Sequence, residues 1–62
     1  MPHVEIKLYK GRTPAQKQAA ARRIIQVLVE ECGATHSHTD VVFQDIERTD
    51  WIVGEDPPAG KT

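Results

Sequence analysis

The chain has 62 residues, of which 39% are hydrophobic and 27% charged, with a formal net charge of −1. This balance leaves no basic surface for nucleic acid or an anionic membrane, and no apolar run approaches the roughly 20 residues of a membrane span. Cys32 is the only cysteine, which excludes an internal disulfide and a zinc site built on a cysteine pair. We expect a single domain over residues 1–62 with no metal, no cofactor, no nucleic-acid partner and no membrane association.

The small size of the chain predicts a homo-oligomer. A domain of this length buries only about 60% of its unfolded surface, and no disulfide or metal staples it. Small domains without such staples often gain stability by associating. The amino terminus lacks the apolar core of a signal peptide, and a single free cysteine suits a reducing compartment. The expected location is therefore the cytoplasm.

The first predicted element is a β-strand over residues 3–9. Val4, Ile6 and Leu8 alternate with polar residues, which is the period of a strand with one face covered. His3 lies beside Pro2 and could tune its environment, although an exposed strand position is the simpler interpretation.

A helix over residues 14–32 follows a short turn. Thr13 suits the N-cap, Pro14 the first helical position, and Gln16 completes a capping box. Gly33 is a natural C-terminal stop. An apolar stripe along this helix is predicted at the positions Ala20, Ala21, Ile24, Val27, Leu28 and Glu31.

A second strand is predicted over residues 39–46, where Val41, Val42 and Phe43 are strong β formers. Strand, helix and strand form an α/β fold of one βαβ unit with parallel strands and a right-handed crossover. Two such units would pair into a four-stranded sheet with helices on one face. Residues 49–54 are expected to form a short hairpin or arm, and residues 55–62 a poorly ordered tail.

Pro2 is the first candidate for chemistry because it directly follows Met1. Methionine is normally removed before a small residue, and removal would turn the proline nitrogen into a secondary amine. An α-amino group titrates at about 7.7–8.0, and an apolar pocket lowers that pKa. A base with a pKa near neutrality suits proton-transfer catalysis. If Met1 is retained, the nitrogen is an amide without a proton, and this chemistry is impossible.

Arg12 and Trp51 are the next candidates. Arg12 lies beside the predicted helix N-terminus and offers a rigid fork that matches a carboxylate. Pro2 and Arg12 lie at opposite ends of the first strand, roughly 20 Å or more apart, so they can act on one small substrate only between subunits. Trp51 either covers the sheet of a partner subunit or forms an apolar wall of the site, and both interpretations can hold together.

One ordered set of features runs along the chain: Pro2, an alternating strand, Gly11-Arg12-Thr13, Gln16-Lys17 on a helix, a valine-rich strand and the aromatic Trp51. This set resembles the 4-oxalocrotonate tautomerase family over residues 2 to about 54. The resemblance implies the βαβ unit described above, assembled as a dimer with a four-stranded sheet. It also implies further assembly into a hexamer as a trimer of dimers, with the dimer as the smaller possibility.

The resemblance also implies roles for individual residues. Pro2 would shuttle a proton between the enol oxygen and a carbon of a small 2-hydroxy or 2-keto unsaturated acid. Arg12 would bind the substrate carboxylate from a neighbouring subunit. Trp51 would form the apolar wall, and Tyr9 falls where the family usually has an aliphatic wall residue.

Asp40 departs from the family pattern, because it occupies the position of the family's second arginine. A carboxylate there would repel an anionic substrate, which favours a monoacid such as phenylenolpyruvate over a dicarboxylate. Arg48 is an alternative source of the missing cation.

Three hypotheses follow from these residues. The first is a cofactor-independent tautomerase acting on a small-molecule carboxylate. The second is the same fold catalysing hydration, dehalogenation or amine-dependent addition to an activated alkene. The third is a non-catalytic subunit of a tautomerase-like assembly, for which Asp40 and a retained Met1 would be the marks.

Overall fold

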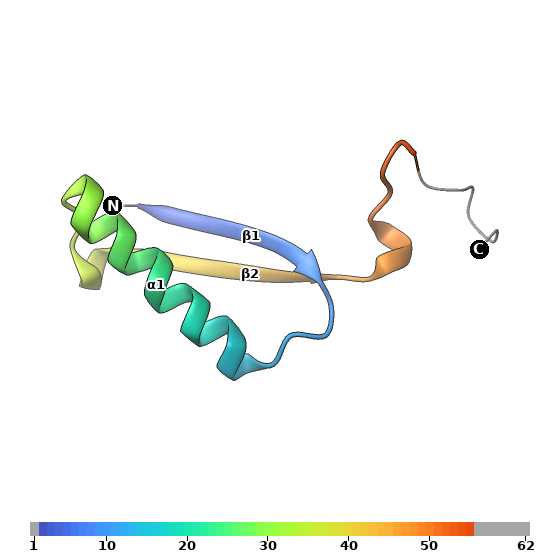
Figure 1. Ribbon diagram of the computed structural model, residues 1–62, viewed down its shortest axis with the longest axis horizontal. Coiled ribbons are helices and arrows are strands. Elements are labelled where there is room, and N and C mark those ends of the chain that lie inside the picture. The colour runs from blue at the N-terminus through green and yellow to red at the C-terminus, as the bar shows by residue number, and fades with distance from the viewer. Residues whose placement is uncertain (1, 56–62) are drawn as a thin grey trace.

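The computed structural model describes residues 2–55, and its elements follow the predicted order. They are β1 (His3–Tyr9), α1 (Pro14–Cys32), a 3₁₀ helix at His36–His38, β2 (Asp40–Ile46) and a 3₁₀ helix at Arg48–Asp50. The two strands pair in parallel, and α1 forms the crossover between them (Figure 1). The prediction of an α/β fold built on one βαβ unit is therefore confirmed.

Helix α1 begins and ends at the residues that the capping signals indicate. The Gln16 amide donates to Thr13 Oγ1 at 3.1 Å, and the Thr13 amide donates to Gln16 Oε1 at 2.8 Å, so the capping box is complete. At the other end Gly33 adopts a left-handed conformation with φ of 70°, which glycine reaches without steric cost. This turn lets the Gly33 amide donate to the Val29 carbonyl and closes the helix.

The face of α1 that is covered agrees only in part with the predicted apolar stripe. Val27 was expected in that stripe but is 54% exposed, and Ala20 is also exposed. Ala21, Ile24 and Leu28 of the predicted stripe are half-buried, together with the neighbouring Ile25 and Val29. Lys17 on the same helix binds Asp45 of β2 through an ion pair of 2.8 Å. The covered face of α1 therefore includes a charged residue, Lys17, beside its apolar side chains.

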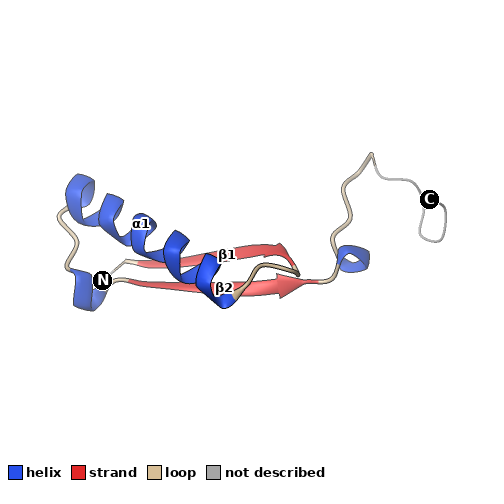
Figure 2. Cartoon of the chain, turned by 60° about the horizontal axis from the view of Figure 1, so that its bottom comes forward, coloured by secondary structure: helices blue, strands red, loops and turns tan. Residues whose placement is uncertain are grey.

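The register of the strands assigns each side chain to one of two faces. Val4 pairs with Val41 and Ile6 with Phe43, and these half-buried residues share the face that α1 covers. His3, Glu5 and Lys7 pair with Asp40, Val42 and Gln44 on the opposite face. Figure 2 shows that no other element within residues 2–55 lies over that opposite face.

The second strand begins at Asp40, so the predicted first residue, Thr39, lies just outside it. Thr39 is the only residue among those described whose exposure falls to 8%. Its hydroxyl donates to the Thr35 carbonyl at 2.7 Å, and its amide donates to the His36 carbonyl. These bonds fold Thr39 back onto the 3₁₀ helix at His36–His38 instead of into the ladder.

The carboxyl-terminal region is an arm and contains no strand within residues 47–55, so the predicted hairpin is not found. After the 3₁₀ helix at Arg48–Asp50, the arm runs past the carboxyl ends of both strands (Figure 1). Residues 56–62 of the expected tail lie outside the described residues.

Apolar surface remains uncovered throughout the described chain. Among residues 2–55 no apolar side chain is fully buried, and Val42 and Ile52 are 48% and 80% exposed. Both strands are edge strands of a two-stranded sheet, and a sheet of this size is marginal in water by itself.

Candidate active site

Pro2 lies immediately before β1 and is half-buried. Its carbonyl accepts a hydrogen bond of 3.2 Å from the Asp40 amide, which fixes the start of β1 against the start of β2. Pro2 and Asp40 are therefore neighbours at the amino ends of the two strands, as the parallel register requires.

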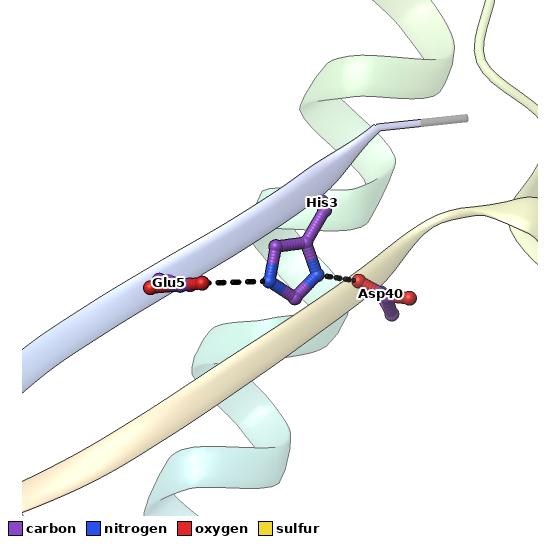
Figure 3. A network of polar contacts seen from close by, with 3 residues as sticks. All are labelled: His3, Glu5 and Asp40. Carbon is purple, nitrogen blue, oxygen red and sulfur yellow. Dashed lines mark hydrogen bonds and ion pairs between the residues drawn. The ribbon is translucent and has the colours of Figure 1, made fainter.

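His3 bridges two carboxylates next to Pro2 (Figure 3). Its Nδ1 contacts Asp40 Oδ1, and its Nε2 lies 3.1 Å from Glu5 Oε1. All three side chains lie on the face of the sheet opposite α1. Two hydrogen bonds raise the pKa of His3, the larger effect coming from Asp40 and the smaller from Glu5, because both carboxylates favour the imidazolium. We call Pro2, His3, Glu5 and Asp40 the amino-end group.

The contact between His3 and Asp40 changes the interpretation of residue 40. Asp40 was expected to place a carboxylate in the site that repels an anionic substrate. Instead its carboxylate has a cationic partner whenever His3 is protonated. The repulsion that Asp40 exerts on an anionic substrate is reduced accordingly.

The raised pKa of His3 predicts a pH-dependent contribution to stability. A group whose pKa is higher in the folded state stabilises the fold fully below its unfolded value of 6.5, and this contribution is lost as the pH rises through the folded-state pKa. We expect His3→Gln to lower the urea midpoint at about pH 5.5 and to have less effect at about pH 8.5. The effect is small because all three side chains are exposed.

Urea unfolding at fixed protein concentration checks this expectation, with His38→Gln as a matched control. His38 is also exposed, and none of the hydrogen bonds or ion pairs found within residues 2–55 involves its side chain. A loss of stability in His3→Gln that is equal at both pH values would contradict a charge-dependent role for His3.

A second set of side chains gathers at the carboxyl ends of the strands. The rings of Tyr9 and Trp51 have centroids 5.1 Å apart and an interplanar angle of 56°. The guanidinium carbon of Arg48 lies 4.3 Å from the centroid of the Tyr9 ring. Arg12 is exposed in the loop that leads from β1 into α1. We call Tyr9, Arg12, Arg48 and Trp51 the carboxyl-end group.

The two loops that carry this group are joined by main-chain and side-chain bonds. The Lys10 amide donates to the Ile46 carbonyl at 3.0 Å, and Lys10 Nζ binds Glu47 Oε1 at 2.9 Å. These contacts hold the segment before Arg12 against the segment before Arg48.

The fold separates the predicted site residues within one chain. Pro2 and Asp40 belong to the amino-end group, whereas Tyr9, Arg12 and Trp51 belong to the carboxyl-end group. Seven strand residues lie between them in β1, which corresponds to roughly 20 Å or more. One chain therefore cannot present both groups to a single small molecule.

Two members of these groups were not identified as binding residues from the sequence. His3 was interpreted as an exposed strand residue, and Arg48 only as an alternative cation. The signal for His3 is its spacing of two residues from Glu5, which puts both side chains on one face of a strand.

Two further features are absent from residues 2–55. None of the helices there has the length and apolarity needed to cross a bilayer. In the same residues no cluster of three or more histidine, cysteine, aspartate or glutamate side chains has a geometry that could hold a metal ion.

Comparison with known proteins agrees with the fold. The sequence profile of the tautomerase enzyme family matches residues 2–60, and the chain belongs to this family. The chain is 37% identical over 51 residues to 2-hydroxymuconate tautomerase of Pseudomonas putida, covering 82% of this chain and 81% of that protein. It is 39% identical over 46 residues to a probable tautomerase of Streptococcus pneumoniae, covering 74% and 77%.

Solved structures show the same architecture. A structure from work on the 4-oxalocrotonate tautomerase isozymes of Methylibium petroleiphilum superimposes with a TM-score of 0.79 and 32% identity, covering 86% of each chain. YwhB, a homologue of 4-oxalocrotonate tautomerase, gives a TM-score of 0.81 over 89% of this chain and 90% of that one, at 24% identity, and supports the fold alone. The protein is thus an isomerase of the tautomerase type.

Proposed function

We propose that the protein catalyses keto–enol tautomerisation of a small 2-hydroxy or 2-keto unsaturated acid without a cofactor. The base is the secondary amine of Pro2 after removal of Met1. It takes the proton from the enol oxygen and returns it to a carbon of the same substrate, so no other reactant is consumed. The observation that supports this proposal is the place of Pro2, half-buried and hydrogen-bonded to Asp40 at the start of β1 in a chain of the tautomerase family.

The other predicted site residues have complementary roles in this proposal. Arg12 binds the substrate carboxylate, because its exposed guanidinium is free of ion pairs among residues 2–55. Tyr9 and Trp51 form an apolar wall against the unsaturated part of the substrate. Asp40 contacts the substrate from beside Pro2, with its charge shared with His3.

The complete site lies between subunits in this proposal, because one chain keeps its two groups of site residues at opposite ends of the sheet. The assembly is a homo-oligomer, and a hexamer built as a trimer of dimers accounts for the uncovered sheet face and the exposed arm. The dimer is the smaller alternative.

We expect no stable folded monomer at micromolar concentration, since the described residues bury no apolar side chain fully. Sedimentation velocity and circular dichroism at the same concentrations check this. A species that sediments at the monomer mass of 6.9 kDa and retains its helix signal would contradict the intersubunit site.

The activity is tested with phenylenolpyruvate, whose ketonisation is followed by ultraviolet absorbance. The intact mass is measured first, because it reports whether Met1 has been removed. Protein with a confirmed Pro2 terminus is expected to accelerate ketonisation over buffer. No rate above buffer from such protein would overturn the proposed activity on this class of acid.

A further inference from the structure

Arg48 presents a cationic guanidinium within the carboxyl-end group. Its guanidinium carbon lies over the Tyr9 ring, 4.3 Å from the centroid, and a guanidinium carries five N–H donors. No carboxylate forms an ion pair with Arg48 in residues 2–55. The adjacent carboxylate of Glu47 binds Lys10 at 2.9 Å instead. The donors of Arg48 are therefore available to a ligand.

We propose that Arg48 is a second carboxylate-binding residue of the site and determines its preference for substrates that carry two carboxylates. The proposal rests on the proposed function, since it assigns a further ligand contact to the same site. Arg48 is a binding residue in this proposal and takes no part in proton transfer.

The neighbours of Arg48 favour recognition of an unsaturated acid. Trp51 lies beside Tyr9, with its ring centroid 5.1 Å from that of Tyr9. A flat conjugated chain can pack on these rings while its terminal carboxylate accepts two parallel hydrogen bonds from the guanidinium.

Arg12 and Arg48 offer two cations at the same end of the sheet. The bonds from Lys10 to Ile46 and Glu47 hold their two loops together. At the amino end, by contrast, residue 40 is a carboxylate, and the nearby His3 already binds Asp40 and Glu5. The cations that bind two carboxylates are therefore drawn from loops that follow β1 and β2.

The test compares two ligands that differ by one carboxylate: 2,4-hexadienedioate (muconate) and 2,4-hexadienoate (sorbate). Isothermal titration calorimetry gives the affinity of the full-length wild-type oligomer for each. The variants are Arg48→Ala and Arg48→Lys, and the control is Arg23→Ala, which removes an exposed arginine from α1. Circular dichroism and sedimentation confirm that each variant is folded and assembled.

We expect the wild type to bind muconate more tightly than sorbate by roughly ten- to a hundredfold. Arg48→Ala should remove most of that preference, and Arg48→Lys should retain part of it because an ammonium keeps the charge but not the bidentate geometry. Arg23→Ala should bind both ligands as the wild type does. If Arg48→Ala does not fold, the intermediate preference expected of Arg48→Lys decides the question.

Three results would overturn the role of Arg48. In the first, the wild type binds muconate no more tightly than sorbate. In the second, an Arg48 variant keeps the wild-type preference. In the third, an Arg48 variant loses affinity equally for both ligands, which would indicate a purely structural contact with Tyr9. A failure of the proposed catalysis is recognised separately. In that case phenylenolpyruvate is not turned over, while the muconate preference still depends on Arg48.

Discussion

Pro2→Ala is expected to lower kcat for the ketonisation of phenylenolpyruvate by roughly 10²–10⁴-fold, the range in which a positioned general acid–base contributes. Alanine also allows removal of Met1, so the variant keeps a terminal amine. That amine is primary and less restricted than the proline ring, which explains why residual activity is expected. KM should change little, because the carboxylate contacts lie in the carboxyl-end group.

The control for this variant is wild-type protein in which Met1 is retained. Its Pro2 nitrogen is a tertiary amide that can neither accept nor deliver a proton, so this preparation should be inactive although its sequence is otherwise unchanged. Intact mass distinguishes the preparations. An active protein with Met1 in place, or a Pro2→Ala variant with wild-type kcat, would exclude Pro2 as the base.

Local signals in the sequence predicted the βαβ unit well, because they act between residues that are close in the chain. The capping box of Thr13 and Gln16 and the left-handed turn at Gly33 define α1 without any tertiary contact. The alternation around Ile6 marks β1 for the same reason.

The errors arose where contacts between distant residues decide the structure. Val27 fits an apolar stripe, but the ion pair between Lys17 and Asp45 belongs to the packing of α1 on β2 and is not visible in the helical period. Thr39 has a good strand propensity, yet its hydroxyl bonds the Thr35 carbonyl and leaves the ladder. Propensity is a weak guide when such side-chain bonds compete with a strand.

The candidate site shows the same division. The places of Pro2 before β1 and of Arg12 before α1 could be predicted, because both depend on local signals along the chain. The partnership of His3 with Asp40 joins residues 37 positions apart and follows from the strand register alone. The contact of Arg48 with the Tyr9 ring similarly depends on the strand pairing, because Tyr9 ends β1 and Arg48 follows the end of β2.

Arg12→Ala is expected to raise KM for phenylenolpyruvate by roughly ten- to a hundredfold, because a hydrogen bond to a charged group contributes about 1.5–3 kcal/mol. This contact is made to the substrate carboxylate both before and during proton transfer. Loss of such uniform binding raises KM and leaves kcat nearly unchanged. Arg12→Lys should give an intermediate KM, since it retains the charge but cannot form two parallel hydrogen bonds.

Steady-state kinetics of Arg12→Ala, with Arg22→Ala as the control, decides between binding and other roles. Arg22 is an exposed arginine of α1 outside both groups of site residues, so its removal changes the net charge equally without removing the proposed contact. If Arg12→Ala keeps the wild-type KM, the substrate carboxylate is bound by a residue other than Arg12. A fall in kcat at constant KM would show that Arg12 acts only in the transition state, and the carboxylate would then have to be bound by another cation of the assembly.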